Sequence, residues 1–401
     1  MKTEVLIIGG GVPGLTLALL LGQKGIETCV VDTEKVIPLN EVELTGRTSA
    51  LWAESIELLK SARVWDAVES YTEPLRALRI IDDSSKVMDP VQVDFESREI
   101  GLEVFGYNTP NAKLRAALVE EISKFEKIMH IAPARLHDYT ATPSKIIARL
   151  EGKTEIEANL IIGADGRNSV TRHMAGIEVS KQDYGQSALT CVIDHTLDHG
   201  GISTEHHRPG GPFTTVPMPN KQSAIVWMEK TEDAERFIKL EKQHFEQALQ
   251  ERTRDSLGKV TLATNPECWP IITQNAKALT APRCALMAEA AHVMSPIGAQ
   301  GLNLSLRDVR SLANVIIKAM SVGEDPGSAT VLQKYARERK ADVDTRVNGI
   351  DLFNRLVSNN KSSLRGLRRM GLKTLDTLPM LKEFTMMQGL TPQSFHNAGK
   401  R

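Results

Sequence analysis

The chain has 401 residues, of which 41% are hydrophobic and 25% are charged, and its formal net charge is -1. This length predicts two domains, or one large domain with an insertion. The near-zero charge argues against a nucleic-acid partner held by the overall field of the protein.

The cysteines and the chain start indicate the cellular compartment. Cys29, Cys191, Cys268 and Cys284 are scattered along the chain. Their spacing predicts neither a disulfide framework nor a metal site, so a reducing cytoplasm is the expected location. The chain runs from Met1 directly into a strand-like segment, and its longest apolar stretch is too short to span a bilayer. We therefore expect neither a signal peptide nor a membrane-spanning helix.

Residues 5–34, VLIIGGGVPGLTLALLLGQKGIETCVVDTE, predict a β-α-β unit. A short β-branched strand leads into a glycine-rich turn, and an apolar helix then extends to about Gln23. A second strand, residues 29–31, ends at Asp32. An acidic residue at this place is suited to hydrogen-bond the ribose of a dinucleotide.

Gly9, Gly11 and Gly14 form a G-x-G-x-x-G motif in that turn. The first glycine permits the tight turn, the second permits close approach of a pyrophosphate, and the third permits packing of helix on strand. The alternative is a glycine turn in an unrelated α/β unit. Strand, helix and acid together favour a dinucleotide site, but the motif does not separate NAD from FAD.

The remaining elements follow from hydrophobic spacing. We expect helices over 47–68, 111–127 and 231–254, and throughout the chain after Ser328. We expect strands over 77–82, 91–95 and 284–287, and a run of strands between about 186 and 229.

GADGRNSVTR, residues 163–172, follows a strand-like run. Asp165 could close a ribose or nicotinamide site, and Arg172 could steady the turn or bind an anion. The alternative is an ordinary turn in which Ser169 caps a helix, and for this stretch alone we favour that alternative.

AHVMSPIGAQGLNLSLRD, residues 291–308, places Pro296, Gly298 and Gly301 just before a helix. A helix start carries unpaired N–H groups and partial positive charge, and glycine permits close approach of a ligand. The stretch therefore predicts a cradle for a flat, polar or anionic group.

Together these motifs resemble the class A flavoprotein aromatic hydroxylases, which share the para-hydroxybenzoate hydroxylase fold. The resemblance spans nearly the whole chain and is closest to the ubiquinone-biosynthesis hydroxylase branch, especially its alphaproteobacterial members. The stretches that carry it include RTSALWAESIELL, PLRALRIIDD, FGYNTPNAKLRAAL, GGPFTTVPMP and EAAHVMSPIGAQGLNLSLRDV.

The resemblance implies an α/β fold: a Rossmann-like FAD-binding domain, an inserted, mostly antiparallel substrate sheet and a helical C-terminal tail. We expect the FAD-binding domain to comprise 1–75, 100–182 and 276–328. The substrate domain would comprise 76–99 and 183–275, and the helical tail 329–401.

The resemblance also implies which residues bind FAD. The loop from Pro296 to Asn303, which we call the flavin loop, would cradle the isoalloxazine ring, with backbone N–H groups near Leu302 and Asn303 facing its N1–C2 edge. The full expected set is Gly9, Gly11, Gly14, Asp32, Arg47, Asn111, Asp165, Glu289, Pro296, Gly298, Gly301, Leu302 and Asn303.

Two departures from the family pattern bear on FAD affinity. Family members usually have Gly-Asp where this chain has Ala288-Glu289, and Ser305 replaces a small glycine at the helix start. Glutamate keeps the charge but is one methylene longer, and alanine removes the freedom of glycine. Both changes are sterically tolerable, but they make FAD affinity the first quantity to measure.

The activity implied is hydroxylation of the aromatic ring of a polyprenylated phenol through a flavin C4a-hydroperoxide. NADH or NADPH and dioxygen would be co-substrates, and no catalytic triad is expected.

No residue stands out as the base: we expect His292 to be structural, and His206-His207 to be exposed beside a turn. Phe213, Val216 and Trp227 could line a ring pocket, but they are equally consistent with the core.

The tail stretch 352–387 mixes basic residues with Leu and Met, which permits contact with an anionic membrane surface. The alternative is a packed helical tail with solvated charges, which the residues alone favour. The resemblance implies a substrate with a lipid tail, and with such a substrate the two alternatives are equally favoured. The expected location is cytoplasmic, or peripheral at the inner side of the membrane, and other ubiquinone-biosynthesis proteins are candidate partners.

Rival functions remain open. Another small phenol could be the substrate, and a flavin halogenase or a prenyl-chain reductase could have the same fold, although the tryptophans do not form the W-x-W-x-I-P motif of halogenases. A non-catalytic relative that organises a biosynthetic complex is the rival from another class.

Overall fold

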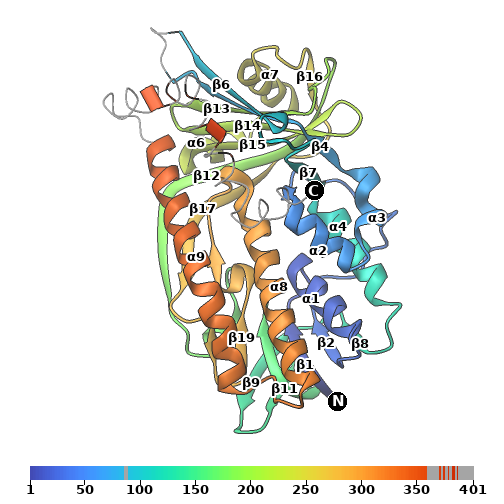
Figure 1. The fold of residues 1–401 in the computed structure, drawn as a ribbon. Coiled ribbons are helices and arrows are strands. Elements are labelled where there is room, and N and C mark those ends of the chain that lie inside the picture. Colours follow the sequence, from blue (N-terminus) through green and yellow to red (C-terminus); the bar gives the residue numbers. More distant parts are fainter. Residues whose placement is uncertain are drawn as a thin grey trace.

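The computed structural model describes residues 1–84, 89–358 and isolated positions between 370 and 386. The molecule has two large sheets, one toward each end of its long axis (Figure 1). A small three-stranded sheet lies between them. This mixed α/β architecture confirms the predicted fold class.

The eight-stranded sheet has the order β18-β19-β11-β1-β2-β8, in which the strands from β19 to β8 are parallel and β18 is antiparallel to β19. The β9–β10 hairpin continues from β11. Its strands are β1 (Lys2–Ile8), β2 (Thr28–Val31), β8 (Ile128–Ile131), β9 (Leu136–Ala141), β10 (Ile146–Leu150), β11 (Glu155–Gly163), β18 (Thr280–Ala281) and β19 (Cys284–Leu286). The central strands are continuous apolar runs, as expected of parallel strands covered on both sides.

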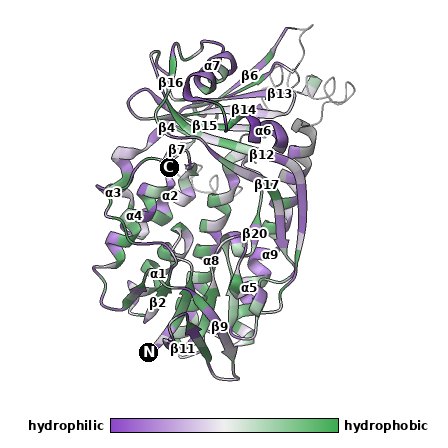
Figure 2. Ribbon diagram, turned by 180° about the vertical axis from the view of Figure 1, so that it is seen from behind, coloured by the Kyte–Doolittle hydropathy of each residue, from purple (hydrophilic) through white to green (hydrophobic). Residues whose placement is uncertain are grey.

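Among the helices that pack into the core of this sheet are α1 (Val12–Gly22), α4 (Asn111–Ile122) and α8 (Gln300–Ser321). Figure 2 shows the hydrophobic residues of α1 in green. A short helix, α5 (Val170–Met174), follows β11. The long α9 (Ala329–Ser358) lies against α8 and runs from β18 at one end to β13 and β14 at the other (Figure 1).

The nine-stranded sheet has the order β20-β17-β12-β15-β14-β13-β5-β6, with β16 attached to β12, and all its pairs except β5–β13 are antiparallel. Its strands are β5 (Ala77–Asp82), β6 (Val91–Glu96), β12 (Val179–His195), β13 (Ile202–Arg208), β14 (Gly211–Met218), β15 (Gln222–Lys230), β16 (Val260–Leu262), β17 (Glu267–Ala276) and β20 (His292–Val293). Thus β20, from the 276–328 stretch, also joins this sheet.

The small sheet consists of β3 (Thr48–Trp52), β7 (Gly106–Pro110) and β4 (Glu73–Leu75). The helix expected over 47–68 is therefore wrong in its first part. Residues 48–52 pair with β7, and helix forms only in α2 (Ala53–Ser61) and α3 (Trp65–Val68). A tertiary hydrogen-bonding partner outweighs the local helical spacing here.

The expected helix over 231–254 is two helices, α6 (Thr231–Phe237) and α7 (Lys242–Thr253). Ala234 from the first and Phe245 and Leu249 from the second share one apolar core with Trp227 of β15. The break lets both helices turn an apolar side toward the same sheet, which a single straight helix of mostly charged residues would not achieve.

A charge network joins α8 to α9 and predicts a dependence of stability on pH. Asp342 accepts hydrogen bonds from Arg339 at 2.7 Å and Arg346 at 2.9 Å. Burial opposes ionisation of Asp342, but these bonds and the charges of Arg339 and Arg307 outweigh it and lower its pKa from 3.8 to about 2. A depressed folded pKa stabilises the fold above the unfolded pKa, and this stabilisation is lost as the pH falls toward about 2.

We therefore expect Asp342→Asn to lower the free energy of unfolding at pH 7 by on the order of 2 kcal/mol, from about 1.4 kcal/mol per pKa unit. The difference between wild type and variant should shrink as the pH falls from about 5 to about 3. Urea unfolding at a series of pH values measures both effects. A difference that stays constant over this range would contradict the assignment.

Candidate functional site

The glycine turn after β1 is built as the motif predicts. Gly9 has φ 113°, and a Cβ there would lie 2.2 Å from the carbonyl oxygen of Ala164. A Cβ on Gly14 would lie 2.0 Å from the carbonyl oxygen of Gly9. Any side chain at either position would displace backbone, so both glycines shape the turn.

Gly11 differs because it borders open space. The nearest atom to a Cβ built there is Cδ of Pro13, at 3.8 Å. Helix α1 begins directly after Gly11, has Pro13 in its first turn and has no side-chain cap at its start. The turn therefore leaves room and N–H groups for an anionic group such as a pyrophosphate.

Asp32 lies at the end of β2 and is buried, with a fractional exposure of 7%. Its Oδ2 accepts a hydrogen bond from Arg115, whose Nε also donates to the carbonyl of Gly10 at 2.9 Å. Arg115 was not predicted as a site residue. It lies one helical turn after Asn111 on α4, and that spacing was the only signal in the sequence that could have identified it.

The flavin loop adopts an unusual backbone. Gly298 has φ 72° and Ala299 has φ 51°, both left-handed, and α8 begins at Gln300 without a side-chain cap. A Cβ on Gly301 would have no described atom within 4 Å. The loop thus presents an uncapped helix start toward open space.

The side chain of Asn303 is fully engaged within the protein. Its Oδ1 accepts hydrogen bonds from Trp52 N–H at 3.0 Å and Ser55 Oγ at 2.7 Å, and its Nδ2 donates to the carbonyls of Ala50 and Ala299 at 2.8 Å each. Asn303 therefore fixes the loop to β3, and only backbone groups of this residue remain to contact a ligand.

The departure at Ala288-Glu289 has a visible backbone cost. Ala288 has φ 54°, a conformation that glycine adopts freely and that costs other residues roughly 1–2 kcal/mol. Its N–H donates to Asp308 at 2.9 Å, which holds the turn in this conformation. Glu289 is 46% exposed at its side chain and lies 3.7 Å from Nε of Arg167.

The departure at Ser305 is accommodated without a clash. Its hydroxyl donates to the carbonyl of Gly301 at 2.9 Å, and the residue is buried. His292 is also buried, and its Nε2 lies 2.6 Å from Asp308 Oδ2. Burial and this contact support the expectation of a structural histidine, which stays a prediction.

At the Asp165-Gly166 turn, the side chain of Asp165 is hydrogen-bonded within the protein. Asp165 accepts hydrogen bonds from Ser169 Oγ at 2.5 Å and from Thr171 N–H at 3.0 Å, and Ser169 caps α5. Arg172 donates to the carbonyls of Ala290 at 2.9 Å and Arg167 at 3.0 Å, so it steadies the turn. Burial lowers the pKa of its guanidinium.

Arg47 and Asn111 meet through the backbone, because Asn111 N–H donates to the carbonyl of Arg47 at 3.1 Å. The guanidinium of Arg47 stacks over the ring of Trp269, 4.5 Å from its centroid. Oδ1 of Asn111 is buried and has no hydrogen-bond partner among the described residues. An unsatisfied acceptor of this kind fits a ligand that donates a hydrogen bond.

The groups that could hold a dinucleotide gather at one edge of the eight-stranded sheet. Gly9 follows β1, Asp32 follows β2, Asp165 follows β11 and Ala288 follows β19, and these strands are parallel neighbours. Ligands of open α/β sheets bind at this edge. The residues present therefore fit FAD.

The candidate ring-pocket residues do not lie together. Phe213 and Trp227 are each 1% exposed and pack with α6 and α7 on the outer side of the nine-stranded sheet. Val216 lies on the other side, in a cluster that includes Trp52 and Ala299.

The expectation that His206 and His207 are exposed is wrong, since both are buried. His206 lies near Phe213 and contacts Asp83, whereas His207 contacts Glu205. Strand β13 lies between β5 and β14, with α7 and its neighbours on one side and α9 near the other. Adjacent residues of a strand point to opposite faces of the sheet, and both faces are covered here, so His206 and His207 are both buried.

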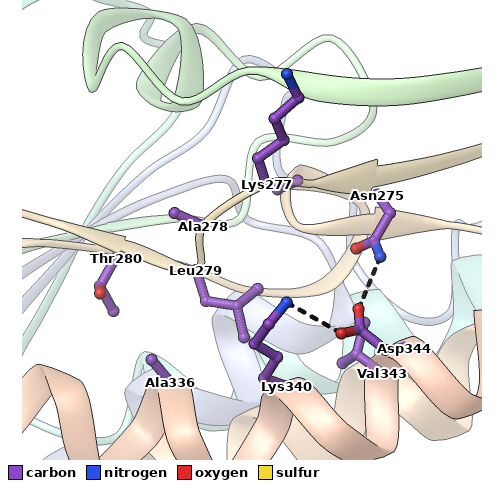
Figure 3. A pocket seen from close by; sticks show the side chains of 10 residues that line it. Asn275, Lys277, Ala278, Leu279, Thr280, Ala336, Lys340, Val343 and Asp344 are labelled. Carbon is purple, nitrogen blue, oxygen red and sulfur yellow. Dashed lines mark hydrogen bonds and ion pairs between the residues drawn. The ribbon is translucent and has the colours of Figure 1, made fainter.

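One pocket, with a volume of about 220 Å³, lies between the β17–β18 connection and α9 (Figure 3). Three of its polar side chains bond to one another, because Asp344 accepts from Asn275 and from Lys340, each at 3.0 Å. A second, of about 520 Å³, lies on the outer side of the nine-stranded sheet and is lined by Arg208, Phe213, Trp227 and Arg252, among others. Neither pocket contains a residue of the predicted FAD set.

Most of the 352–387 stretch lies outside the described residues, so the membrane hypothesis for the tail is not addressed by the structure. Within the part of the chain that is described, no helix has both the length and the apolar character needed to cross a membrane.

Comparison with known proteins agrees with the geometry. The family model described as FAD binding domain matches residues 2–348. Ubiquinone hydroxylase UbiL of Rhodospirillum rubrum is 32% identical over 96% of this chain and 89% of its own length. The 3-demethoxyubiquinol 3-hydroxylase of Escherichia coli is 32% identical over 97% of this chain and 98% of its own length.

Among solved structures, p-nitrophenol 4-monooxygenase PnpA from Pseudomonas putida superposes with a TM-score of 0.79. The match covers 98% of this chain and 99% of that chain at 15% identity, so it supports the fold. The family match over residues 2–348 and the two relatives together identify the chain as a member of the FAD-binding monooxygenase family, in its ubiquinone-hydroxylase branch.

Proposed function

We propose that this protein is an FAD-dependent monooxygenase that hydroxylates the aromatic ring of a polyprenylated phenol in ubiquinone biosynthesis. NADH or NADPH and dioxygen are its co-substrates. The observation that carries the proposal is the flavin loop, with left-handed Gly298 and Ala299 before an uncapped α8, in a chain whose relatives are named ubiquinone hydroxylases.

In this proposal the FAD-binding domain comprises 1–75, 100–182 and 276–328, and the substrate domain comprises 76–99 and 183–275. Gly11 and the start of α1 hold the pyrophosphate, while Asp32, oriented by Arg115, holds the adenosine ribose. Arg47, Asn111 and Glu289 contact the remainder of the cofactor, and the flavin loop holds the ring.

FAD, when bound, supplies the redox chemistry by which electrons from the nicotinamide activate dioxygen. The protein contributes placement and electrostatics. The first N–H groups of α8, near Leu302 and Asn303, stabilise negative charge beside the helix start. Asn303 keeps that helix start in position through its four hydrogen bonds to β3, Ser55 and the loop.

Water is excluded by an apolar cluster that touches both the flavin loop and the nine-stranded sheet. Ala50, Trp52 and Phe95 are buried in it, and Val216 and Ala299 pack against it. Such surroundings strengthen electrostatic interactions and suppress side reactions of activated oxygen.

The test is oxygen transfer. The FAD-loaded protein is supplied with NADH or NADPH, a prenylated phenol and isotopically labelled dioxygen, and the product is analysed by mass spectrometry. Incorporation of one labelled oxygen atom into the ring is expected. A product without the label, or no turnover of any phenol by fully FAD-loaded protein, would refute the proposal and favour the non-catalytic, complex-organising alternative.

We also propose that the protein works in the cytoplasm at the inner side of the membrane, where a lipid-tailed phenol resides, and that it contacts the membrane surface and other proteins of the pathway. The basic and apolar residues of 352–387 support this. In a liposome flotation assay the full-length protein should float with anionic vesicles, and protein that remains in the pellet fraction would count against membrane contact.

A further inference from the structure

Helix α9 lies against α8, the helix that begins in the flavin loop (Figure 1). The residues of α9 that face α8 are three or four positions apart and are Arg339, Asp342, Val343, Arg346 and Val347. Val343 and Val347 are buried against Leu304, in the second turn of α8. This apolar contact brings the polar members of the same face close to the flavin loop.

Arg346 connects this face of α9 to the flavin loop. Its Nη1 donates a hydrogen bond to Oε1 of Gln300, the first residue of α8, at 3.0 Å. Its Nε donates to Oδ1 of Asp342 at 2.9 Å, and only 14% of the Arg346 side chain is exposed. Because the guanidinium is planar, two bonds in different directions fix its orientation, and with it the position of Gln300.

The support behind Arg346 is anchored in the core. Asp342 also accepts a hydrogen bond from Nη1 of Arg339 at 2.7 Å, and Nε of Arg339 donates to Asp308 at 2.8 Å. The side chains of Arg339 and Asp308 are 6% and 1% exposed. Charge-assisted hydrogen bonds of this kind hold side chains in a specific geometry. Arg346 is therefore held from behind by a buried chain of ion pairs.

The flavin loop has a backbone that benefits from such support. Ala299, directly before Gln300, has φ 51°, which is unfavourable for a residue other than glycine. Asn303 holds the end of the loop to β3 through its side chain. Arg346 holds the loop at Gln300, so the first turn of α8 is attached to β3 on one side and to α9 on the other.

We propose that Arg346 is a positioning residue of the FAD site, which acts through Gln300 to hold the start of α8 where its N–H groups meet the flavin ring. This inference rests on the part of the proposed function that places the ring at the flavin loop. The N–H groups near Leu302 and Asn303 favour negative charge on the ring, and the reduced ring carries more negative charge than the oxidised ring. Loss of the bond between Arg346 and Gln300 should therefore shift bound FAD toward its oxidised form.

The test measures the ratio of reduced to oxidised FAD in full-length, FAD-loaded protein. The protein is poised against a reference dye of known potential, and the ratio is read from the visible absorbance. Arg346→Met, Gln300→Met and the double variant are compared with wild type, because methionine removes the bond and keeps a long side chain that suits a helix. Arg337→Met is the matched control. Arg337 lies on the same helix and also donates to a glutamine, Gln333, at 3.2 Å, but at the exposed surface.

Each single variant should lower the ratio about tenfold at the same potential, which is the size of effect expected from one lost hydrogen bond to a charged group. The double variant should lower it by about the same factor, because both substitutions remove one interaction. Gln300→Met leaves the charge of Arg346 in place, so an equal effect in that variant excludes a direct action of the charge. Arg337→Met should leave the ratio unchanged.

An unchanged ratio in either single variant would overturn the positioning role, and Gln300→Met decides alone if Arg346→Met does not fold. Independent effects in the double variant, about a hundredfold together, would also overturn it. Labelled oxygen in the product of wild type with an unchanged ratio in the variants would refute the positioning role alone. The expected ratios without labelled product would refute the hydroxylase and keep the positioning role, and wild-type protein that binds no FAD would refute both.

Discussion

Replacing Asp308 with alanine should lower the free energy of unfolding by about 3–5 kcal/mol, the usual cost of removing one partner of a buried charge pair. Asp308 is 1% exposed and accepts hydrogen bonds from Arg339 Nε at 2.8 Å, from His292 Nε2 at 2.6 Å and from the N–H of Ala288 at 2.9 Å. Burial opposes its ionisation, but His292 and Arg339 outweigh burial and lower its pKa. The variant would remove the acceptor of Arg339 Nε, so that the buried guanidinium keeps only Asp342 among the described residues, and it would leave the N–H of Ala288 without its acceptor.

Urea unfolding at neutral pH measures this effect. Glu324→Ala is the control, since Glu324 is 49% exposed and pairs with Lys334 at 3.4 Å, an interaction worth roughly 0–1 kcal/mol. Equal losses in the two variants would contradict the role assigned to Asp308. If Asp308→Ala does not accumulate as folded protein, Asp308→Asn keeps the side-chain volume and one acceptor oxygen, and it should unfold at a urea concentration between those of the alanine variant and wild type.

Gly11→Ala should fold normally but bind FAD at least about tenfold more weakly, a loss of about 1.4 kcal/mol or more. Because a Cβ at this position meets only Cδ of Pro13 at 3.8 Å, the protein itself has space for it. The added methyl group would instead occupy the space through which the backbone approaches the pyrophosphate.

FAD titration of the apoprotein and urea unfolding without FAD together test this separation. Gly349→Ala is the matched control. Gly349 lies in α9 with open space around its Cβ position, so alanine there should stabilise the helix by roughly 0.5–1 kcal/mol and leave FAD affinity unchanged. Unchanged FAD affinity in Gly11→Ala would remove this glycine from the pyrophosphate site.

The parts of the site that could be predicted from the sequence are those that depend on local backbone conformation. Gly9 and Gly298 have positive φ. Such a position can be recognised in the sequence, because few residues other than glycine adopt this backbone conformation. The unusual Ala288 could be identified as a departure for the same reason, and it does adopt φ 54°. The acid at Asp32 was predictable because strand ends in a β-α-β unit have fixed places.

The parts that could not be predicted depend on which elements cover a strand. Phe213 and Val216 are three residues apart, so strand alternation places them on opposite sides of β14, but the alternation does not say which side is near the flavin loop. His206 and His207 are polar and still buried, because elements distant in sequence cover both sides of β13. Arg115 contacts Asp32, which lies 83 positions earlier in the chain, and hydrophobic spacing does not encode such a contact.

The strand order of the eight-stranded sheet also constrains when the protein can fold during its synthesis. Strand β1 pairs with β11, and β11 pairs with β19, so the sheet is incomplete until residues 284–286 have left the ribosome. At roughly 5–20 residues per second, the time between the synthesis of β1 and the synthesis of β19 is on the order of 15–60 s. Nearly the whole nine-stranded sheet, from β5 to β17, is translated within that interval. The nascent chain can therefore form most of the nine-stranded sheet before the eight-stranded sheet can be completed.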